Sequence, residues 1–86
     1  MKDKLRIWLK KYMILDAMWD AQWNQWETRS DKKHEAEITM EKLEHLMDGM
    51  TEALNCFGYG VRKTHGEYEV VNAYTGKVVI REGSAS

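Results

Sequence analysis

In the stretch LNCFGYGV, residues 54–61, the hydrophobic pattern changes from the period of a helix to that of a strand. Before this stretch, apolar residues recur every three or four positions, which is typical of an amphipathic helix. After it, apolar and polar residues alternate, as in a half-buried strand. Gly58 stands where a left-handed residue commonly ends a helix. This junction divides the chain into a helical part and a β part.

Two long helices are predicted before the junction. Between Asp3 and Thr28 there is no glycine or proline, and the polar residues 29–33 separate this helix from a second at Lys33–Phe57. A short connector favours an antiparallel pair. Gly49 inside the second helix is expected to mark a close helix crossing. The apolar seams are Leu5, Trp8, Tyr12, Leu15, Trp19 and Trp26 on the first helix, and Ala36, Met40, Leu43, Met47, Met50, Leu54 and Phe57 on the second.

Three strands are predicted after the junction, at residues 59–64, 67–73 and 77–81. His65-Gly66 has the composition of a tight hairpin turn. For the second turn, a two-residue loop at Thr75-Gly76 would split the apolar residues between two faces. A three-residue loop with Gly76 left-handed gathers them on one face, so this register is preferred. The predicted inner face is Tyr59, Val61, Tyr68, Val70, Val78 and Ile80, with Arg62, Glu67, Glu69, Lys77 and Arg81 outside.

The sequence therefore predicts an α+β fold, in which a two-helix antiparallel hairpin is followed by a three-stranded antiparallel meander. With 86 residues the chain has room for one core, and residues 1–82 are expected to form a single domain. Residues 83–86 are small and polar and are expected to form a flexible tail. The single cysteine excludes an internal disulfide, so stability must come from packing or from a partner subunit.

Motifs of catalytic and metal sites are absent from the sequence. It has no glycine-rich phosphate loop, paired-cysteine knuckle or nucleophile elbow. His45 is close to Glu41 and Asp48 along the second helix, but the Glu-x-x-His spacing of helical di-iron sites is missing. Cys56 ends that helix, where the helix dipole opposes thiolate formation, so a buried thiol is expected. We therefore expect no enzyme activity, no metal and no cofactor.

Two surfaces are candidates for binding a partner protein. An acidic band on the second helix is explained most simply as a solvated face, and the functional alternative is that it docks onto a basic groove. Tryptophans near the end of the first helix have the composition of an interface hot spot, and core packing is the alternative. The candidate partner-binding residues are Glu37, Glu41, Glu44, Asp48, Glu52, Trp19, Trp23 and Trp26.

The first helix also has more apolar surface than one packing partner needs. Ile7, Ile14 and Ala21 lie opposite its main seam, with Met18 beside them. Either the second helix and the sheet cover both sides, or another chain covers the surplus, as in a homodimer. Ile7, Ile14 and Met18 are the candidate self-association residues.

Charge is unevenly distributed along the chain. Residues 1–12 carry five basic side chains and one acidic, whereas residues 16–52 carry ten acidic and four basic. The basic segment could bind phosphate, which leaves a nucleotide or small-anion sponge as one function class. No basic face extends across the domain, so nucleic-acid binding is not expected.

Residues 50–59, MTEALNCFGY, and the YTGK segment at 74–77 resemble small uncharacterised proteins encoded by bacteriophages and mobile elements. The resemblance implies an accessory protein that binds and blocks or adapts a larger host machine, as anti-CRISPR and other anti-defence proteins do. It implies no role for individual residues.

The leading hypothesis is a non-enzymatic protein-binding module, in its finer form a phage inhibitor that occludes a bacterial defence complex such as CRISPR–Cas. The alternatives are a homodimeric structural protein and a nucleotide or small-anion sponge or regulator. No apolar run approaches the ~18 residues of a membrane span, and the N-terminus is too charged for a signal peptide. The protein is expected in the cytoplasm, which is the host's if a phage encodes it.

Overall fold

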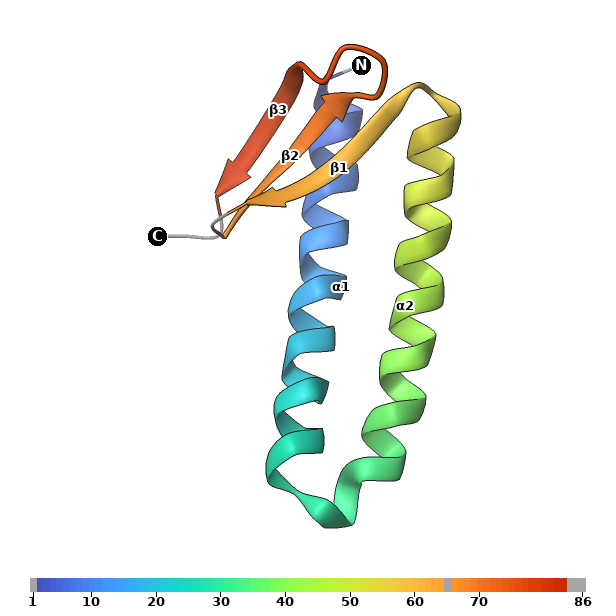
Figure 1. Cartoon of the computed structure of the whole chain (residues 1–86), viewed down its shortest axis with the longest axis vertical. Helices are drawn as coiled ribbons and strands as arrows, with labels where there is room; N and C mark the ends of the chain where they lie inside the picture. The colour runs from blue at the N-terminus through green and yellow to red at the C-terminus, as the bar shows by residue number, and fades with distance from the viewer. Residues whose placement is uncertain (1, 65, 84–86) are drawn as a thin grey trace.

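Two long helices and a three-stranded sheet make up the structure, a computed structural model that describes residues 2–64 and 66–83 (Figure 1). The meander β1-β2-β3 packs across one end of the antiparallel helix pair, so the predicted α+β arrangement is confirmed. The elements are α1 (Lys2–Thr28), the short 3-10 helix η1 (Ser30–Lys32), α2 (Lys33–Cys56), β1 (Tyr59–Thr64), β2 (Glu67–Asn72) and β3 (Val78–Gly83). Gly83, assigned to the tail from the sequence, is the last residue of β3, and residues 84–86 lie outside the described residues.

The junction between the helical and β parts is built on a left-handed glycine. Gly58 has a φ of +86°, and its N–H donates to the carbonyl of Asn55 at 2.9 Å, which closes the last turn of α2. A Cβ at this position would also lie 3.2 Å from the ring of Tyr74. The predicted helix end is therefore confirmed, and both backbone conformation and space restrict the position to glycine.

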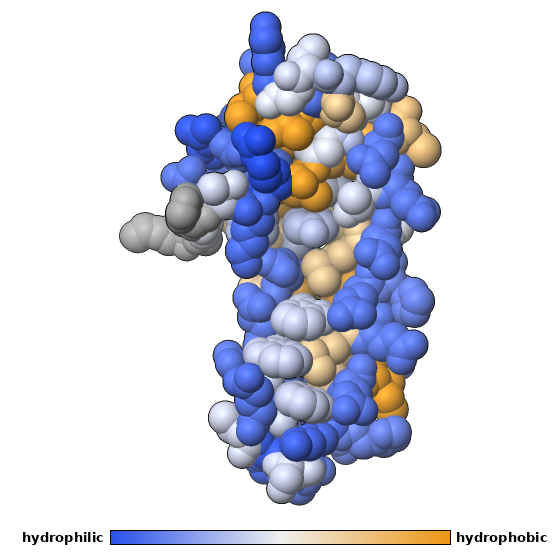
Figure 2. Space-filling view, viewed as in Figure 1, coloured by the Kyte–Doolittle hydropathy of each residue, from blue (hydrophilic) through white to orange (hydrophobic). Residues whose placement is uncertain are grey.

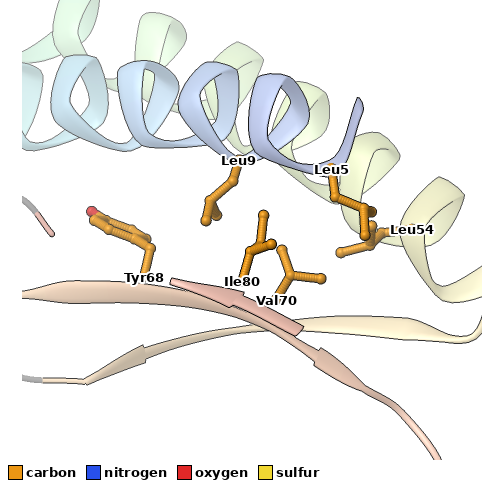
Figure 3. Packing of buried hydrophobic residues seen from close by; sticks show 6 residues of the cluster. All are labelled: Leu5, Leu9, Leu54, Tyr68, Val70 and Ile80. Carbon is orange, nitrogen blue, oxygen red and sulfur yellow. The ribbon is translucent and has the colours of Figure 1, made fainter. Parts of the chain in front are cut away.

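A cluster of six buried side chains holds the sheet against the helices (Figure 3). Leu9 and Val70 are fully buried, and burying one such side chain contributes about 1.5–3 kcal/mol. The cluster is Leu5 and Leu9 from α1, Leu54 from α2, Tyr68 and Val70 from β2, and Ile80 from β3. Since four elements, α1, α2, β2 and β3, each contribute to the cluster, none can leave without exposing the others.

The register of the sheet follows the prediction at its centre and departs from it near the second turn. Val70 pairs with Ile80, as expected, but Val71 pairs with Val78, which leaves Val79 as an extra residue in β3. Val78 is therefore on the outer face and 41% exposed, so its predicted inward position was wrong. Val79 packs against the core instead.

The chemistry of the turn explains this bulge. The side chain of Asn72 accepts hydrogen bonds from the N–H groups of Tyr74 and Thr75, at 2.9 and 3.0 Å. The Asn72 N–H donates to the carbonyl of Lys77, so the loop contains four residues rather than the predicted three. The predicted left-handed Gly76 is confirmed, with a φ of +75°. The first turn includes His65, which lies outside the described residues; Thr64 pairs with Glu67 across it.

Two features of α2 also differ from the prediction. Phe57 follows the helix rather than extending its seam, and it is 75% exposed. Gly49 is exposed, and a Cβ at this position would have no atom within 4 Å apart from its chain neighbours and the backbone of its own helix, so Gly49 marks no helix crossing among the described residues. The remaining seam residues face α1, with Ala36, Met40, Leu43 and Leu54 buried.

The outer face of the sheet carries a buried carboxylate between two arginines. Glu69 on β2 accepts hydrogen bonds from Arg62 on β1, at 2.7 and 2.9 Å, and from Arg81 on β3, at 2.8 Å. Only 7% of its side chain is exposed, although the sequence pattern placed it outside. The hydrogen bonds from Arg62, and then those from Arg81, hold the pKa of Glu69 below its ordinary value. One carboxylate therefore joins all three strands.

We predict that Leu9→Ala lowers the free energy of unfolding by about 2–5 kcal/mol, because it opens a cavity in the cluster. Ile38→Ala is the matched control, since Ile38 is 40% exposed and its truncation should change stability by no more than about 0.5 kcal/mol. Urea denaturation at one fixed protein concentration measures both. Equal losses in the two variants would contradict the assigned core.

We predict that Glu69→Gln destabilises the fold at pH 7 and that this difference from wild type disappears in acid. Because the folded pKa of Glu69 is lowered, its stabilisation is fully present above the ordinary value of 4.5 and is lost as the pH falls through the folded value. Unfolding measured from pH 7 to pH 3 tests this, with the exposed Glu52→Gln as control. A wild-type advantage that does not decrease between pH 7 and pH 3 would refute the assignment.

Candidate protein-binding site

Three tryptophans on α1 form a continuous stack, here called the tryptophan ladder. Ring centroids are 5.7 Å apart between Trp19 and Trp23 and 5.2 Å apart between Trp23 and Trp26, with ring planes within 6° and 17° of parallel. Spacings of four and three residues place all three on one side of a helix. Trp23 is 39% exposed and the other two are partly buried. The ladder therefore presents aromatic surface to solvent in a fixed arrangement.

Side chains from the beginning and middle of α2 hold the ladder. The indole N–H of Trp19 donates to Glu44 at 3.1 Å, and that of Trp26 donates to Glu37 at 2.9 Å. The ammonium group of Lys33 lies 4.8 Å from the centre of the Trp26 ring, a cation–π distance. One ring of the ladder thus already binds a cation.

Two carboxylates of the acidic band, those of Glu37 and Glu44, lie beside the ladder. Glu37 and Glu44 turn toward α1, whereas Glu41 and Asp48 are exposed on the same flank of α2. Glu41 lies 3.9 Å from His45. The structure brings five of the eight candidate residues into contact, and Glu41 and Asp48 lie within about 60° of Glu44 around α2. These seven are here called the tryptophan–glutamate face: Trp19, Trp23, Trp26, Glu37, Glu41, Glu44 and Asp48. Glu52 lies further along α2, toward the sheet.

This face is on the sheet side of the hairpin. Trp23 lies only about 40° around α1 from Leu9, which packs on the sheet, because each residue turns a helix by about 100°. In Figure 2, residues of intermediate and high hydropathy run down this side below the sheet, between two hydrophilic borders. The aromatic surface therefore occupies the part of the hairpin that the sheet does not reach.

Asp16 closes the boundary between the sheet and the ladder. Its carboxylate accepts hydrogen bonds from the ammonium of Lys63, at 3.0 Å, and from the hydroxyl of Tyr68. Burial is the main cause that raises the pKa of Tyr68, and its hydrogen bond to Asp16 raises it further. The hydrogen bond between Lys63 and Asp16 raises the pKa of Lys63. Sequence reasoning missed this cluster because its members come from α1, β1 and β2. Its contacts join the sheet to α1.

The surplus apolar surface of α1 is uncovered. Ile7, Ile14 and Met18 are 56%, 61% and 47% exposed, and Leu46 on α2 is 57% exposed. The explanation that α2 and the sheet cover both sides of α1 is therefore wrong. We call these four residues the apolar back face.

The predicted burial of Cys56 was wrong. Cys56 is exposed, contrary to the expected buried thiol, because it lies about 160° around α2 from Leu54, which faces the core. Within residues 2–64 and 66–83, no three His, Cys, Asp or Glu side chains are grouped so that they could hold a metal ion.

A cavity of about 280 Å³ lies beside the sheet, at the end of the hairpin where α1 begins and α2 ends. Its lining is almost wholly apolar and aromatic, with the charged side chain of Lys4 at its border. The lining residues are Lys4, Leu5, Trp8, Ala53, Leu54, Phe57 and Tyr59. The sequence did not reveal this cavity, since it depends on Phe57 leaving the seam.

No family model matches the sequence, and neither a curated protein nor a solved structure shows significant similarity to the chain. None of the helices in the described part of the chain is long and apolar enough to cross a membrane.

Proposed function

We propose that the protein is a non-enzymatic binding module whose tryptophan–glutamate face binds a basic segment of a partner protein. The observation that carries the proposal is the juxtaposition of a stacked, partly exposed tryptophan ladder with two carboxylates on the neighbouring helix, those of Glu37 and Glu44. Tryptophan is enriched at the energetic centres of interfaces because it supplies a large rigid contact area.

The rigidity of the ladder supports binding. Stacking and the two indole hydrogen bonds fix the rings before a partner arrives, so little side-chain entropy remains to be lost. The ammonium group of Lys33 lies on the Trp26 ring, which supports the proposal that a lysine or arginine of a partner binds an indole ring in the same way. The exposed carboxylates of Glu41 and Asp48 would attract such side chains and exclude acidic partners.

The finer proposal concerns the class of partner. A channel that binds nucleic acid is lined with basic side chains, because these neutralise phosphates. The resemblance to phage accessory proteins suggests such a channel in a bacterial defence complex, for example CRISPR–Cas, and binding there would exclude the nucleic acid. This step rests on that resemblance and on charge.

Affinity capture from a nuclease-treated bacterial lysate, quantified by mass spectrometry, tests the charge requirement. We expect Glu41→Lys with Asp48→Lys to reduce capture of the partner at least tenfold, because the variant repels a basic surface. Glu35→Lys is the matched control, since Glu35 is an exposed glutamate on α2 outside the face. Undiminished capture by the double variant would refute the proposal.

A second double variant separates the effect of charge on partner binding from the effect of ladder geometry. Glu37→Gln with Glu44→Gln keeps an oxygen for each indole N–H but removes both charges, so a loss of capture here reports charge rather than ladder geometry.

Calorimetric titration with ATP tests the anion-sponge alternative. Saturable ATP binding with no dependence on the tryptophan–glutamate face would favour that alternative.

A further inference from the structure

The cavity between the beginning of α1 and the end of α2 has a buried floor and an open mouth. Two of its lining residues, Leu5 and Leu54, belong to the buried cluster and are only 6% and 3% exposed, so they lie at the floor (Figure 3). Two others, Lys4 and Phe57, are exposed and lie at the mouth. The cavity is therefore an extension of the core that opens to solvent.

Aromatic side chains form the walls of the cavity, and contacts outside it hold them in place. Trp8 stacks on Tyr12 with ring centroids 5.3 Å apart and ring planes within 13° of parallel. The left-handed Gly58 fixes the direction of the chain between Phe57 and Tyr59. The walls therefore exist before a ligand arrives, as is usual for small-molecule sites.

The charge at the mouth is positive. Among the residues that the structure describes, Lys4 is the one charged residue in the lining. The nearest acidic residues along the chain, Asp3 and Glu52, are each turned about 100° around their helix from a lining residue. Lys11 lies about 20° around α1 from Lys4, on the same side of the helix. An anionic group at the mouth would therefore be attracted.

The volume of the cavity limits the size of a ligand. An apolar cavity of about 150 Å³ holds one benzene molecule, or about 25 Å³ for each carbon atom. At that density, the 280 Å³ of this cavity holds about eleven carbon atoms. A nucleoside triphosphate is larger than this and mostly polar, so the cavity does not suit it.

We propose that this cavity binds a hydrophobic carboxylate, whose apolar body of about ten carbon atoms lies against the floor and whose carboxylate lies beside Lys4. Medium-chain fatty acids are the simplest molecules of this class. Because the lining comes from α1, α2 and β1, the bound molecule contacts both the helical and the β part of the chain.

Calorimetric titration with hexanoate, octanoate, decanoate and tetradecanoate, each below its micelle concentration, tests the size of the site. Affinity should increase about fourfold for each CH₂ group that is buried. The increase should stop near dodecanoate, because the cavity is then full. No decanoate binding at millimolar concentrations, or an affinity that still increases at tetradecanoate, would overturn the proposal, since the latter describes adsorption onto exposed apolar surface.

A substitution that fills the mouth tests the location. Ala53→Trp should weaken decanoate binding about tenfold or more, because the indole occupies the space of the ligand. Ala53 is exposed, so the fold should tolerate the change, and circular dichroism checks it. Ala17→Trp is the matched control, an exposed alanine on α1 outside the lining. Undiminished binding by Ala53→Trp would place the site elsewhere and overturn the proposal.

A charge reversal tests the position of the carboxylate. Lys4→Glu should weaken octanoate binding about fivefold or more and leave the binding of octanol, which has no charge, unchanged. Lys10→Glu is the control, since Lys10 is exposed and lies about 120° around α1 from Lys4. Equal losses in the two variants would show that only the net charge of the protein matters and would overturn the assigned orientation.

Membrane lipids also combine an acyl chain with an anionic head group, and vesicles of phosphatidylglycerol distinguish this source from a free fatty acid. The protein should stay in the supernatant when such vesicles are sedimented, because the cavity holds one short chain. Sedimentation with the vesicles, without binding of decanoate, would overturn the proposal in favour of membrane docking.

The cavity and the proposed function can fail independently. None of the residues of the tryptophan–glutamate face lines the cavity. Ala53→Trp should therefore still capture the basic partner, whereas Glu41→Lys with Asp48→Lys should still bind decanoate.

Discussion

The difference in length between the sheet and the helices governs this structure. Six residues of β2 extend about 20 Å, whereas the 27 residues of α1 extend about 40 Å. The six-residue core can therefore form only where the sheet lies (Figures 1 and 3). Beyond it the molecule is two helices thick, and its radius of gyration of 14.4 Å exceeds the roughly 12 Å of a compact chain of this size. All of the candidate binding surface follows from this mismatch.

Local rules predicted the architecture correctly. The change of period after Leu54, the left-handed Gly58 and the pairing of Val70 with Ile80 each depend on residues close in sequence or on simple alternation. The bulge at Val79 was missed because it depends on Asn72 binding the backbone of its own turn. Competition between a turn and a strand register cannot be resolved from hydrophobic alternation alone.

The candidate site was predicted as a set of residues but not as an arrangement. The tryptophan spacing on α1 and the acidic spacing on α2 were both visible in the sequence. Glu37 binds the indole of Trp26, and Glu44 binds that of Trp19. These contacts depend on how the two helices are rotated about their axes, and the apolar seams define that rotation only approximately. A rotation of one residue is about 100°, enough to carry a carboxylate from solvent to the ladder. The burial of Glu69 was missed for a related reason, since it requires arginines on two neighbouring strands.

The two sides of the hairpin have different chemical characters. One carries rigid aromatic rings and negative charge, and the other carries aliphatic side chains at a seven-residue repeat. Because the helices separate them, a substitution on one side leaves the contacts of the other unchanged.

The tryptophan ladder also has an optical consequence. Three indoles within 6 Å of their neighbours and nearly parallel have strongly coupled electronic transitions, and their coupling changes sharply with the angle between the rings. The circular dichroism of the indole bands therefore reports the geometry of the loop end of the hairpin, which lies outside the six-residue core. Partial separation of the two helices at that end would be visible in the spectrum of the unlabelled protein while the sheet remained folded.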